Sequence, residues 1–486
     1  MANYKTPGVY IEEVVKFPPS VAQVATAIPA FIGYTEKAGR NRTLEMKPTR
    51  IASLLEYEEM FGFAEKEGNF NIEINEEYDA EDQLMSRDVY ASLDKIKKSK
   101  HSMYYALQMF YNNGGGACYI VSTGGYGDIS LEQLQKGLDT LESEDEITLL
   151  VFPEATQLSK DDQYYAIQQQ SLKQCAKLKD RFAVMDIYDE DTKTFRDKVG
   201  NNNLKYGAAY YPNLVTVLNH RFDADSIKIT HNIKGGSPAP TPKTTKGKGK
   251  DTTAATPPSS SNITSFNGKT LSEVRTMNNS IYLACVSKIR EIPVELPPSS
   301  AIVGVYAAVD SSRGVWKAPA NVSLNGVSKV TVKLTNAAQE NLNVDTTAGK
   351  SINAIRPFTG KGILVWGART LAGNDNEWRY VSVRRFFNMI EESVKKATMQ
   401  FVFEPNDAGT WVRVRAMIEN FLTLQWRQGA LAGAKAEDAF FVKLGLGETM
   451  TALDILEGRM IIEIGMAVVR PAEFIILKFS HKMQES

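Results

Sequence analysis

The sequence has few of the side chains on which most enzymes and metal sites depend. Its 486 residues include three cysteines and four histidines. The cysteines, Cys118, Cys175 and Cys285, are odd in number and far apart, which gives neither a disulfide framework nor a metal-ligand spacing. We expect three buried, reduced thiols. The histidines form no H-E-x-x-H motif, so the sequence argues against a histidine-based metal cluster or triad.

The chain also lacks an excess of either charge and any long apolar run. Its 56 Lys and Arg residues against 57 Asp and Glu residues provide no positive field to hold nucleic acid or an anionic membrane. The longest apolar stretches, such as residues 301–309, have about half the length that crosses a bilayer. The N-terminus carries Glu12 and Glu13 where a signal peptide is apolar. We expect a protein made in the cytoplasm, with no nucleic-acid partner and no direct membrane insertion.

Motifs for nucleotides and nucleophiles are missing as well. No G-x-S-x-G elbow and no G-x-x-x-x-G-K-S/T loop occurs. The glycines between residues 114 and 127 bracket a strand-like segment, which indicates a helix C-cap, a strand and a turn and not a dinucleotide fingerprint. The acidic residues 142–146 precede an apolar strand and are typical of a solvated loop. The sequence therefore predicts no catalytic residue, no cofactor and no metal.

From residue 147 onward the chain alternates apolar strands with helices. Nearly continuous apolar strands of this kind form mostly parallel sheets covered on both faces, so we expect an α/β fold, α+β overall. The helix at residues 408–432 is the clearest, because its apolar residues share one side and Gly429 and Gly433 mark its end. The predicted strands are residues 30–34, 118–122, 147–155, 181–188, 208–218 and 361–370, and the predicted helices are residues 103–110, 164–179, 301–321 and 408–432.

Three other segments have a less regular pattern. Residues 65–82 are acidic and are predicted to be a polar surface excursion. Residues 237–261 contain no large apolar side chain, so we expect a disordered surface loop between strands at residues 227–233 and 262–266. The four lysines of this loop leave a nucleic-acid patch as the alternative. Residues 321–334 are hairpin-like, with Asn325-Gly326 as the turn signal.

Both ends of the chain are strand-prone and require a covering partner. A chain end frays unless something holds it, and a strand that is apolar on both faces is covered on both sides. The C-terminal strand is therefore either central in its own sheet or completed by another subunit. The residues concerned are Val9, Tyr10, Ile11 and Val14 at the N-terminus and Phe474, Ile475, Ile476, Leu477 and Phe479 at the C-terminus.

A series of segments resembles one known family in the order of its blocks. The segments are TPGVYIEE (residues 6–13), IPAFIGYT (28–35), PPSSAIVGVYAAVDSSRGVWKAPAN (297–321), VWGART (365–370), WRYVSVRR (378–385), FEPN (403–406), WRQGALAGA (426–434) and PAEF (471–474). They resemble the tail sheath proteins of contractile phage tails and related injection machines. Residues 65–82 and 237–261 lie outside this pattern.

The resemblance implies an inner domain beside a tube, built from both chain ends, and an α/β middle region that faces outward. The segments would be an N-terminal arm and core strand (1–35), an outer mixed region (36–145), a middle α/β domain (146–354) and a C-terminal core domain with a strand arm (355–486). In such sheaths the arms add strands to sheets of neighbouring subunits, an inference that the strand-prone ends support independently. We expect linkers near residues 17–20 to act as hinges.

The implied function is that of a structural subunit and not of an enzyme. Copies would polymerise helically around an inner tube and contract from a metastable extended state, driving the tube through a target envelope without hydrolysing a fuel. The implied partners are further copies, the inner tube protein, and baseplate and terminal cap proteins. The particle would be a phage tail or tail-like machine assembled in the bacterial cytoplasm, with release from the cell left open.

Contacts with the tube require charges that can be released. The candidates are Lys435, Glu437 and Asp438, because exposed charges give reversible, salt-sensitive contacts; an ordinary solvated loop is the alternative. Two other functions remain open at this point. One is a cytoplasmic α/β enzyme with a site around Asp186 and Asp310, although a structural or solvated role suits Asp186 better. The other is a static filament or surface-layer protein.

Overall fold

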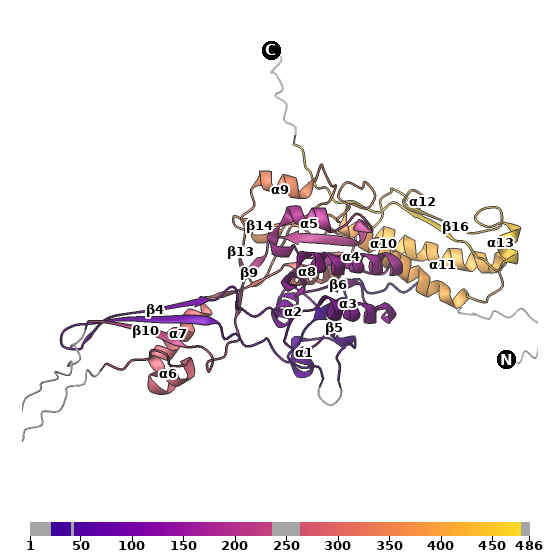
Figure 1. Cartoon of the computed structure of the whole chain (residues 1–486). Coiled ribbons are helices and arrows are strands. Elements are labelled where there is room, and N and C mark those ends of the chain that lie inside the picture. The colour runs from indigo at the N-terminus through magenta and orange to yellow at the C-terminus, as the bar shows by residue number, and fades with distance from the viewer. Residues whose placement is uncertain (1–20, 40–42, 236–262, 478–486) are drawn as a thin grey trace, which may run out of the picture.

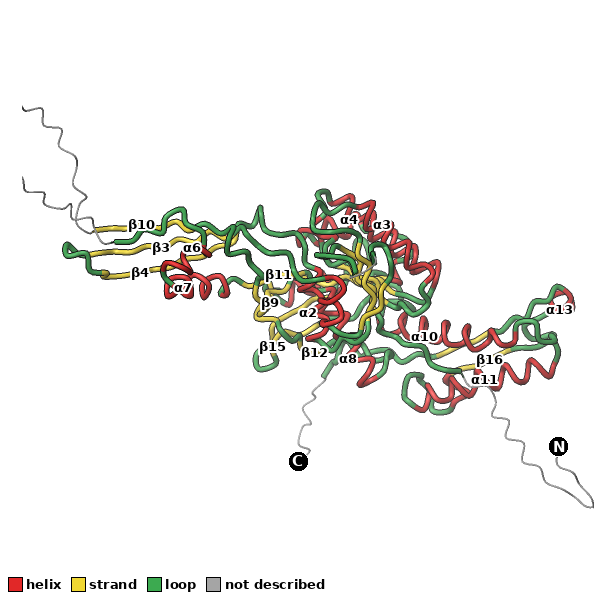
Figure 2. Tube along the Cα trace, turned by 90° about the horizontal axis from the view of Figure 1, so that it is seen from below, coloured by secondary structure: helices red, strands yellow, loops and turns green. Residues whose placement is uncertain are grey.

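The computed structural model of the chain describes residues 21–39, 43–235 and 263–477. In Figures 1 and 2 these residues form a central body with one lobe on each side. The central body holds a nine-stranded sheet. We call the part around β3, β4 and β10 the sheet lobe, and the part around α10 and α11 the helical lobe. The two lobes extend in opposite directions, which makes the molecule elongated.

The nine-stranded sheet confirms the expected mostly parallel arrangement. Its order is β12-β15-β14-β8-β7-β6-β1-β5-β2. The inner strands from β14 to β5 pair in parallel, and the outer strands β2, β15 and β12 pair antiparallel. The strands are β1 (Pro29–Gly33), β2 (Thr49–Ile51), β5 (Cys118–Ser122), β6 (Leu149–Val151), β7 (Phe182–Met185), β8 (Gly207–Tyr211), β12 (Val322–Ser323), β14 (Asn353–Phe358) and β15 (Gly362–Val365).

Helices cover both faces of this sheet, as its apolar strands require. Successive residues of β1 show the alternation: Phe31 packs in one apolar cluster with α2 and α8, while Ala30 and Ile32 pack in another with α3 and α4. The helices α2 and α8 approach closely because Gly304 has no side chain; a Cβ there would lie 2.5 Å from the Phe110 carbonyl oxygen. The helices are α1 (Leu54–Phe61), α2 (Met103–Asn112), α3 (Leu131–Asp139), α4 (Asp161–Leu178), α5 (Thr192–Lys198), α8 (Ser299–Arg313) and α9 (Asn336–Asn343).

Three sequence predictions in the central body were wrong in detail. Residues 208–218 form two strands in different sheets, because Pro212 has no N–H for a sheet ladder and separates β8 from β9 (Leu214–Asn219). Asn325-Gly326 does form a turn, with Gly326 at φ +73°. Its flanking strands do not pair with each other, since β12 joins β15 while β13 (Val327–Val330) joins β9 beside β11 (Pro293–Leu296). The helix predicted to residue 321 ends at Arg313.

Residues 65–82, predicted to be a polar surface excursion with no assigned strand, belong to the regular sheet of the sheet lobe. They include β3 (Phe70–Tyr78), which pairs with β4 (Leu84–Leu93) and β10 (Ile229–Gly235) in a three-stranded sheet. Phe70, Ile72 and Ile74 are buried against α6 (Leu271–Met277) and α7 (Asn279–Arg290). The strand predicted at residues 227–233 corresponds to β10, whereas residues 263–266 are not a strand. The loop prediction for residues 237–261 lies outside the described residues.

The helical lobe consists of two long helices covered by a small sheet. Val414, Ile418 and Phe421 on one side of α11 are buried, as predicted. The helix ends at Arg427, before the predicted residue 432, because the chain turns at Gly429 with φ +85°. The elements are α10 (Val381–Thr398), α11 (Ala408–Arg427), α12 (Ala436–Ala439), β16 (Phe440–Lys443), α13 (Ala452–Leu456) and β17 (Glu463–Met466). None of the described helices has the combined length and apolar character of a bilayer-crossing helix.

Candidate assembly surfaces

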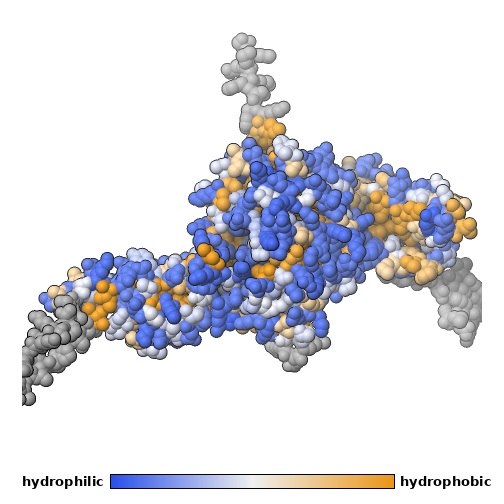
Figure 3. Space-filling view, viewed as in Figure 1, coloured by the Kyte–Doolittle hydropathy of each residue, from blue (hydrophilic) through white to orange (hydrophobic). Residues whose placement is uncertain are grey.

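The C-terminal segment leaves the body as an exposed apolar run. Phe474, Ile475, Ile476 and Leu477 are 69%, 80%, 79% and 73% exposed. They are not part of a strand, so no sheet within the described part of the chain covers them. Figure 3 shows an apolar patch at the foot of the C-terminal trace. An exposed apolar run of this kind marks a binding surface. Phe479, the remaining predicted arm residue, lies outside the described residues.

Glu473, directly before this run, is bound firmly to the body. Its Oε1 atom accepts hydrogen bonds from Arg369 Nε at 2.9 Å and Asn343 Nδ2 at 2.7 Å. Its Oε2 atom accepts from Arg369 Nη2 at 2.6 Å and the Tyr380 hydroxyl at 3.2 Å. Burial opposes ionisation of Glu473, but the hydrogen bonds from Arg369 and Asn343 outweigh it and lower the pKa. We call these four residues the C-terminal clamp.

The N-terminal segment enters the described structure beside the helical lobe. Val21 packs in the apolar cluster of α10 and α11. The Val24 amide donates to Ser393 Oγ of α10 at 3.1 Å. The predicted N-terminal arm residues Val9, Tyr10, Ile11 and Val14, and the hinge candidates at residues 17–20, lie outside the described residues. The chain therefore reaches β1 from the side of the helical lobe.

Thr26 is held by a buried ion pair between two helices. Asp310 on α8 accepts hydrogen bonds from Arg385 Nη1 at 3.1 Å and Nη2 at 2.5 Å, and Arg385 lies on α10. Thr26 Oγ1 donates to Asp310 Oδ2 at 2.6 Å, and its carbonyl oxygen accepts from Arg385 Nη2 at 2.9 Å. We call Thr26, Asp310 and Arg385 the N-terminal clamp. This clamp joins the central body and the helical lobe to the described segment that follows the predicted N-terminal arm. We call that segment, residues 21–28, the root of the N-terminal arm.

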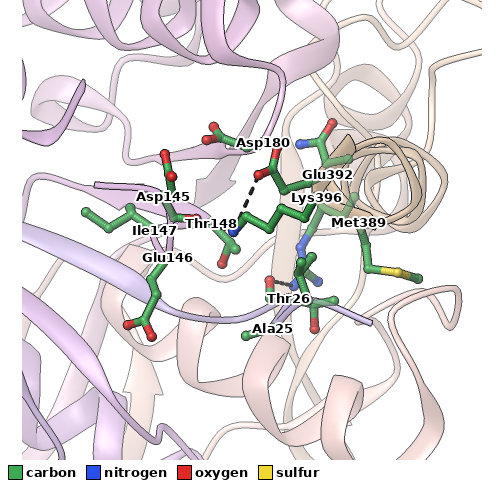
Figure 4. Close-up of a pocket in the computed structure, with 13 residues that line it drawn as sticks. Ala25, Thr26, Asp145, Glu146, Ile147, Thr148, Asp180, Met389, Glu392 and Lys396 are labelled. Atoms are coloured by element: carbon green, nitrogen blue, oxygen red, sulfur yellow. Dashed lines mark hydrogen bonds and ion pairs between the residues drawn. The ribbon is translucent and has the colours of Figure 1, made fainter. Parts of the chain in front are cut away.

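A cavity of about 220 Å³, lined by both charged and apolar side chains, lies beside the N-terminal clamp (Figure 4). Its walls come from Thr26, from residues 145–148 before β6, and from α10. The Lys396 Nζ atom lies 3.4 Å from Glu392 Oε1 and donates to the Asp145 carbonyl oxygen at 3.4 Å. The cavity thus marks the seam between the central body and the helical lobe.

The small sheet of the helical lobe has two unpaired outer edges. β16 and β17 pair antiparallel, and neither pairs with a third strand among the described residues. Val442 is buried against the helices below, whereas Phe441 on the other face is 44% exposed. Free sheet edges present N–H and C=O groups that another chain can bind.

The proposed tube-contact residues lie together beside this sheet. Lys435 precedes α12, and Glu437 and Asp438 are on its first turn. All three side chains are exposed. They lie in one charged segment between α11 and β16, which is compatible with both a contact and a solvated loop.

The two residues of the enzyme alternative lie in unrelated settings. Asp186, at the end of β7, accepts hydrogen bonds from the Ser299 amide at 2.8 Å and hydroxyl at 2.6 Å, while Asp310 belongs to the N-terminal clamp. Asp186 therefore has a structural role at the start of α8.

Over residues 21–39, 43–235 and 263–477 no group of three or more His, Cys, Asp or Glu side chains is placed to hold a metal ion. The three cysteines are buried and unpaired, and burial raises the pKa of Cys118 to about 12.

Models of known families identify the chain. Residues 127–371 match the central domain of the phage tail sheath protein, and residues 373–482 match the phage tail sheath C-terminal domain. The chain belongs to the phage tail sheath family. It is a structural sheath subunit and not an enzyme. The two matches meet close to the point where the central sheet ends and α10 of the helical lobe follows.

Individual sheath proteins match shorter parts of the chain. The tail sheath protein of Burkholderia phage BcepMu is 31% identical over 145 residues, which are 29% of this chain and 30% of that protein. The tail sheath protein of Vibrio phage KVP40 is 27% identical over 131 residues, 26% of this chain and 19% of that protein. The tail sheath protein of Enterobacteria phage T4 is 25% identical over 138 residues, 28% of this chain and 20% of that protein. The matches thus span less than a third of these relatives.

Solved structures match over nearly the whole chain. The helical sheath of the anti-feeding prophage in the contracted state is 33% identical, with a TM-score of 0.65 over 99% of this chain and all of that chain. The PVC sheath complex of an extracellular contractile injection system, also contracted, is 30% identical with a TM-score of 0.62 over 99% of both chains. A chain of the 6-fold symmetrised anti-feeding prophage baseplate is 33% identical, with a TM-score of 0.64 over 99% of this chain and all of that chain.

The sequence did not point to the clamp residues as a group. Arg369 and Arg385 lie within the segments VWGART and WRYVSVRR, but no role was predicted for either. The available signal was an arginine beside an apolar strand or helix, since a buried arginine requires a carboxylate partner. The partner could not be named without the fold.

Proposed function

We propose that copies of this chain polymerise helically around an inner tube and contract from a metastable extended state, driving the tube through a target envelope. The observation that carries this proposal is the C-terminal run at residues 474–477, which is apolar, exposed and attached to the body immediately before it. A monomer gains nothing by exposing such a run. A neighbouring copy that supplies a sheet edge gives it a partner.

The edges of β16 and β17 are the proposed acceptors of the arms. A two-stranded sheet is marginal alone, and added strands complete it. The N-terminal arm with Val9, Tyr10, Ile11 and Val14 and the C-terminal arm with Phe474 to Phe479 supply these strands from neighbouring copies. Each arm strand contributes about 3 to 9 kcal/mol through roughly six backbone hydrogen bonds. Head-to-tail contacts of this kind do not close, so they generate a helical tube.

The two lobes suggest which side of the molecule faces the tube. The N-terminal segment enters beside α10 and α11, so we assign the helical lobe to the inner domain. The segments of this domain, residues 1–35 and 355–486, also include β1, most of β14 and β15 of the central sheet. The sheet lobe lies at the end of the molecule opposite to the helical lobe (Figure 2). We therefore assign the outward side to the region 36–145 and the middle domain 146–354. Lys435, Glu437 and Asp438 then contact the inner tube protein through charges that release on contraction.

The remaining partners and the energy source follow from this arrangement. Baseplate and terminal cap proteins close the ends of the polymer, and the particle assembles in the bacterial cytoplasm as a phage tail or tail-like machine. Contraction uses no fuel, because the energy is stored as the difference between two packings of one set of interfaces. Anti-feeding prophage structures, in which a similar chain occurs both in a baseplate and in a contracted helical sheath, support this proposal.

Deletion of residues 2–16 tests the proposal. The deletion removes the N-terminal strand arm, so we expect folded monomers and no tube-length polymers, measured by velocity sedimentation and negative-stain microscopy. Circular dichroism of the monomer checks its fold. The matched control deletes residues 243–257, an equal length outside the family pattern, and retains polymers. Intact sheaths formed by the variant without residues 2–16 would contradict the arm model.

A further inference from the structure

Both chain ends join the body at a cluster built around a buried arginine. The C-terminal clamp holds Glu473 against Arg369, and the N-terminal clamp holds Thr26 against Asp310 and Arg385. The side chains of Arg369 and Arg385 are only 4% and 3% exposed. Each cluster lies at the root of a proposed arm. Buried ion pairs add little net stability, so their position at both roots requires another explanation.

We propose that the two clamps anchor the roots of the inter-subunit arms, so that the pull of neighbouring copies is carried by the rigid body. This inference rests on the proposed arm pairing, which it extends by assigning the residues that transmit force from each arm to the body. Arms that pair with other copies transmit force only if their roots are fixed. An arm rooted in an unattached loop would lengthen under load before the body moved.

The C-terminal clamp connects the arm to the central sheet. Beyond Val469 the chain makes no backbone hydrogen bond to any other described residue, so the Glu473 side chain carries the attachment. Arg369 in turn is fixed by its backbone: its amide donates to Asn353 Oδ1 at 2.7 Å, and its carbonyl oxygen accepts from Asn353 Nδ2 at 2.8 Å. Asn353 begins β14, which pairs with β8 inside the nine-stranded sheet. Tension on residue 474 therefore reaches the sheet through Glu473 and Arg369.

The N-terminal clamp divides the load between two parts of the molecule. Thr26 lies three residues before the start of β1, which pairs with both β5 and β6. Its contacts to Asp310 and Arg385 connect it to α8 of the central body and α10 of the helical lobe. The Arg385 guanidinium also lies 4.5 Å from the Tyr306 ring centre, which fixes its orientation. Tension on the N-terminal arm therefore reaches both parts together.

Neutral substitutions of equal size test the C-terminal anchor. Glu473→Gln keeps the shape of the side chain and removes the charge that binds Arg369. We expect sheaths that assemble and then break during contraction, with a median length after triggering at least two-fold below wild type by negative-stain microscopy. The control Glu340→Gln removes a charge from an exposed residue of α9 near the clamp and leaves the length unchanged. Equal lengths for Glu473→Gln and wild type would overturn the anchor.

A second pair of variants, at Thr26 of the N-terminal clamp, tests the anchor proposal if Glu473→Gln fails to fold. Thr26→Val removes the hydroxyl donor to Asp310 at nearly constant size, whereas Thr26→Ser retains it. We expect shortened contracted sheaths for Thr26→Val and wild-type lengths for Thr26→Ser. Shortening in both variants, or in neither, would overturn the proposal. The deletion of residues 2–16 separates the arm-pairing hypothesis from the anchor hypothesis. If the deletion abolishes polymers while the clamp variants behave like wild type, arm pairing is retained and only the anchors are refuted.

Discussion

At the scale of single residues, Asp186 is a carboxyl group whose burial affects stability. It is 3% exposed, and burial raises its pKa to about 7 despite the hydrogen bonds from Ser299. An unfolded Asp has a pKa of about 3.9, so between pH ~4 and ~7 the native state holds a proton that the unfolded state has lost. The free energy of unfolding therefore falls as pH rises through this window, by up to about 4 kcal/mol.

Asp186→Asn removes this titration. We expect the variant to lose the fall in unfolding free energy between pH 4.5 and 8, and to exceed wild type in stability at pH 8, because no charge is then buried beside Ser299. Urea denaturation at both pH values measures the difference. Asp225→Asn, at an exposed position, should keep the wild-type slope. Parallel slopes for Asp186→Asn and wild type would show that Asp186 does not titrate in this range.

Residue-scale predictions from the sequence succeeded where the residue type alone decides. Three isolated cysteines were expected to be buried thiols, and all three are buried. The clamps were missed because their partners are distant in sequence: Arg369 and Glu473 are 104 positions apart, and Asp310 and Arg385 are 75 apart. No local pattern encodes which buried arginine meets which carboxylate.

At the scale of helices and strands, the sequence predicted those elements whose apolar residues recur with a regular local period. The strand Cys118–Ser122 was predicted with its observed bounds because an apolar helix, a glycine stop and an apolar run follow one another. β3 was missed because Glu76 occupies one of its buried positions and hides the alternation. Its charge is balanced by Arg87, at 2.5 Å, and it faces His231 across the sheet, at 3.1 Å. Long-range pairing thus overrides the acidic composition of this segment.

The C-terminal arm allows a test at the same scale. Ile476 is 79% exposed in the subunit, so Ile476→Asp should leave the thermal stability of the monomer nearly unchanged. In the proposed polymer the same residue is covered by a neighbour, where an unpaired charge is costly. We expect velocity sedimentation to show monomers in place of polymers.

Ile96 provides the control for this variant. It is 91% exposed and lies on the sheet lobe, away from the arms. Ile96→Asp should polymerise like wild type. Equal polymerisation of the two variants would place Ile476 outside the subunit contact.

At the scale of the whole molecule, the arrangement of the two lobes was beyond the sequence. The mostly parallel sheet follows from apolar strands alternating with helices, but the lobes depend on contacts between segments far apart. Residues 21–28, for example, connect α10, α8 and Thr148 directly before β6. The arrangement gives the molecule opposite ends with different surfaces, as a subunit between a tube and the outside requires.

The proposed contacts between α12 and the inner tube predict that exposed charges at this end of the molecule stabilise the extended sheath. Lys435→Gln, Glu437→Gln and Asp438→Asn combined remove exposed charges that contribute about 0.2 to 1 kcal/mol each and are repeated in every copy. We expect sheaths that contract without a trigger, counted by electron microscopy, because the hold on the tube is weakened while the arms still pair. High salt should have the same effect on wild type, since it screens exposed charges.

The matched control removes as many charges of the same signs from the sheet lobe. Glu73→Gln, Glu77→Gln and Lys234→Gln combined alter exposed residues of β3 and β10, at the opposite end from α12. This variant should keep the wild-type proportion of extended sheaths. Equal proportions in both triple variants would contradict the contact at α12.

A single helical lattice before and after triggering, in wild type itself, would identify a static filament, because contraction requires two packings of the same subunits.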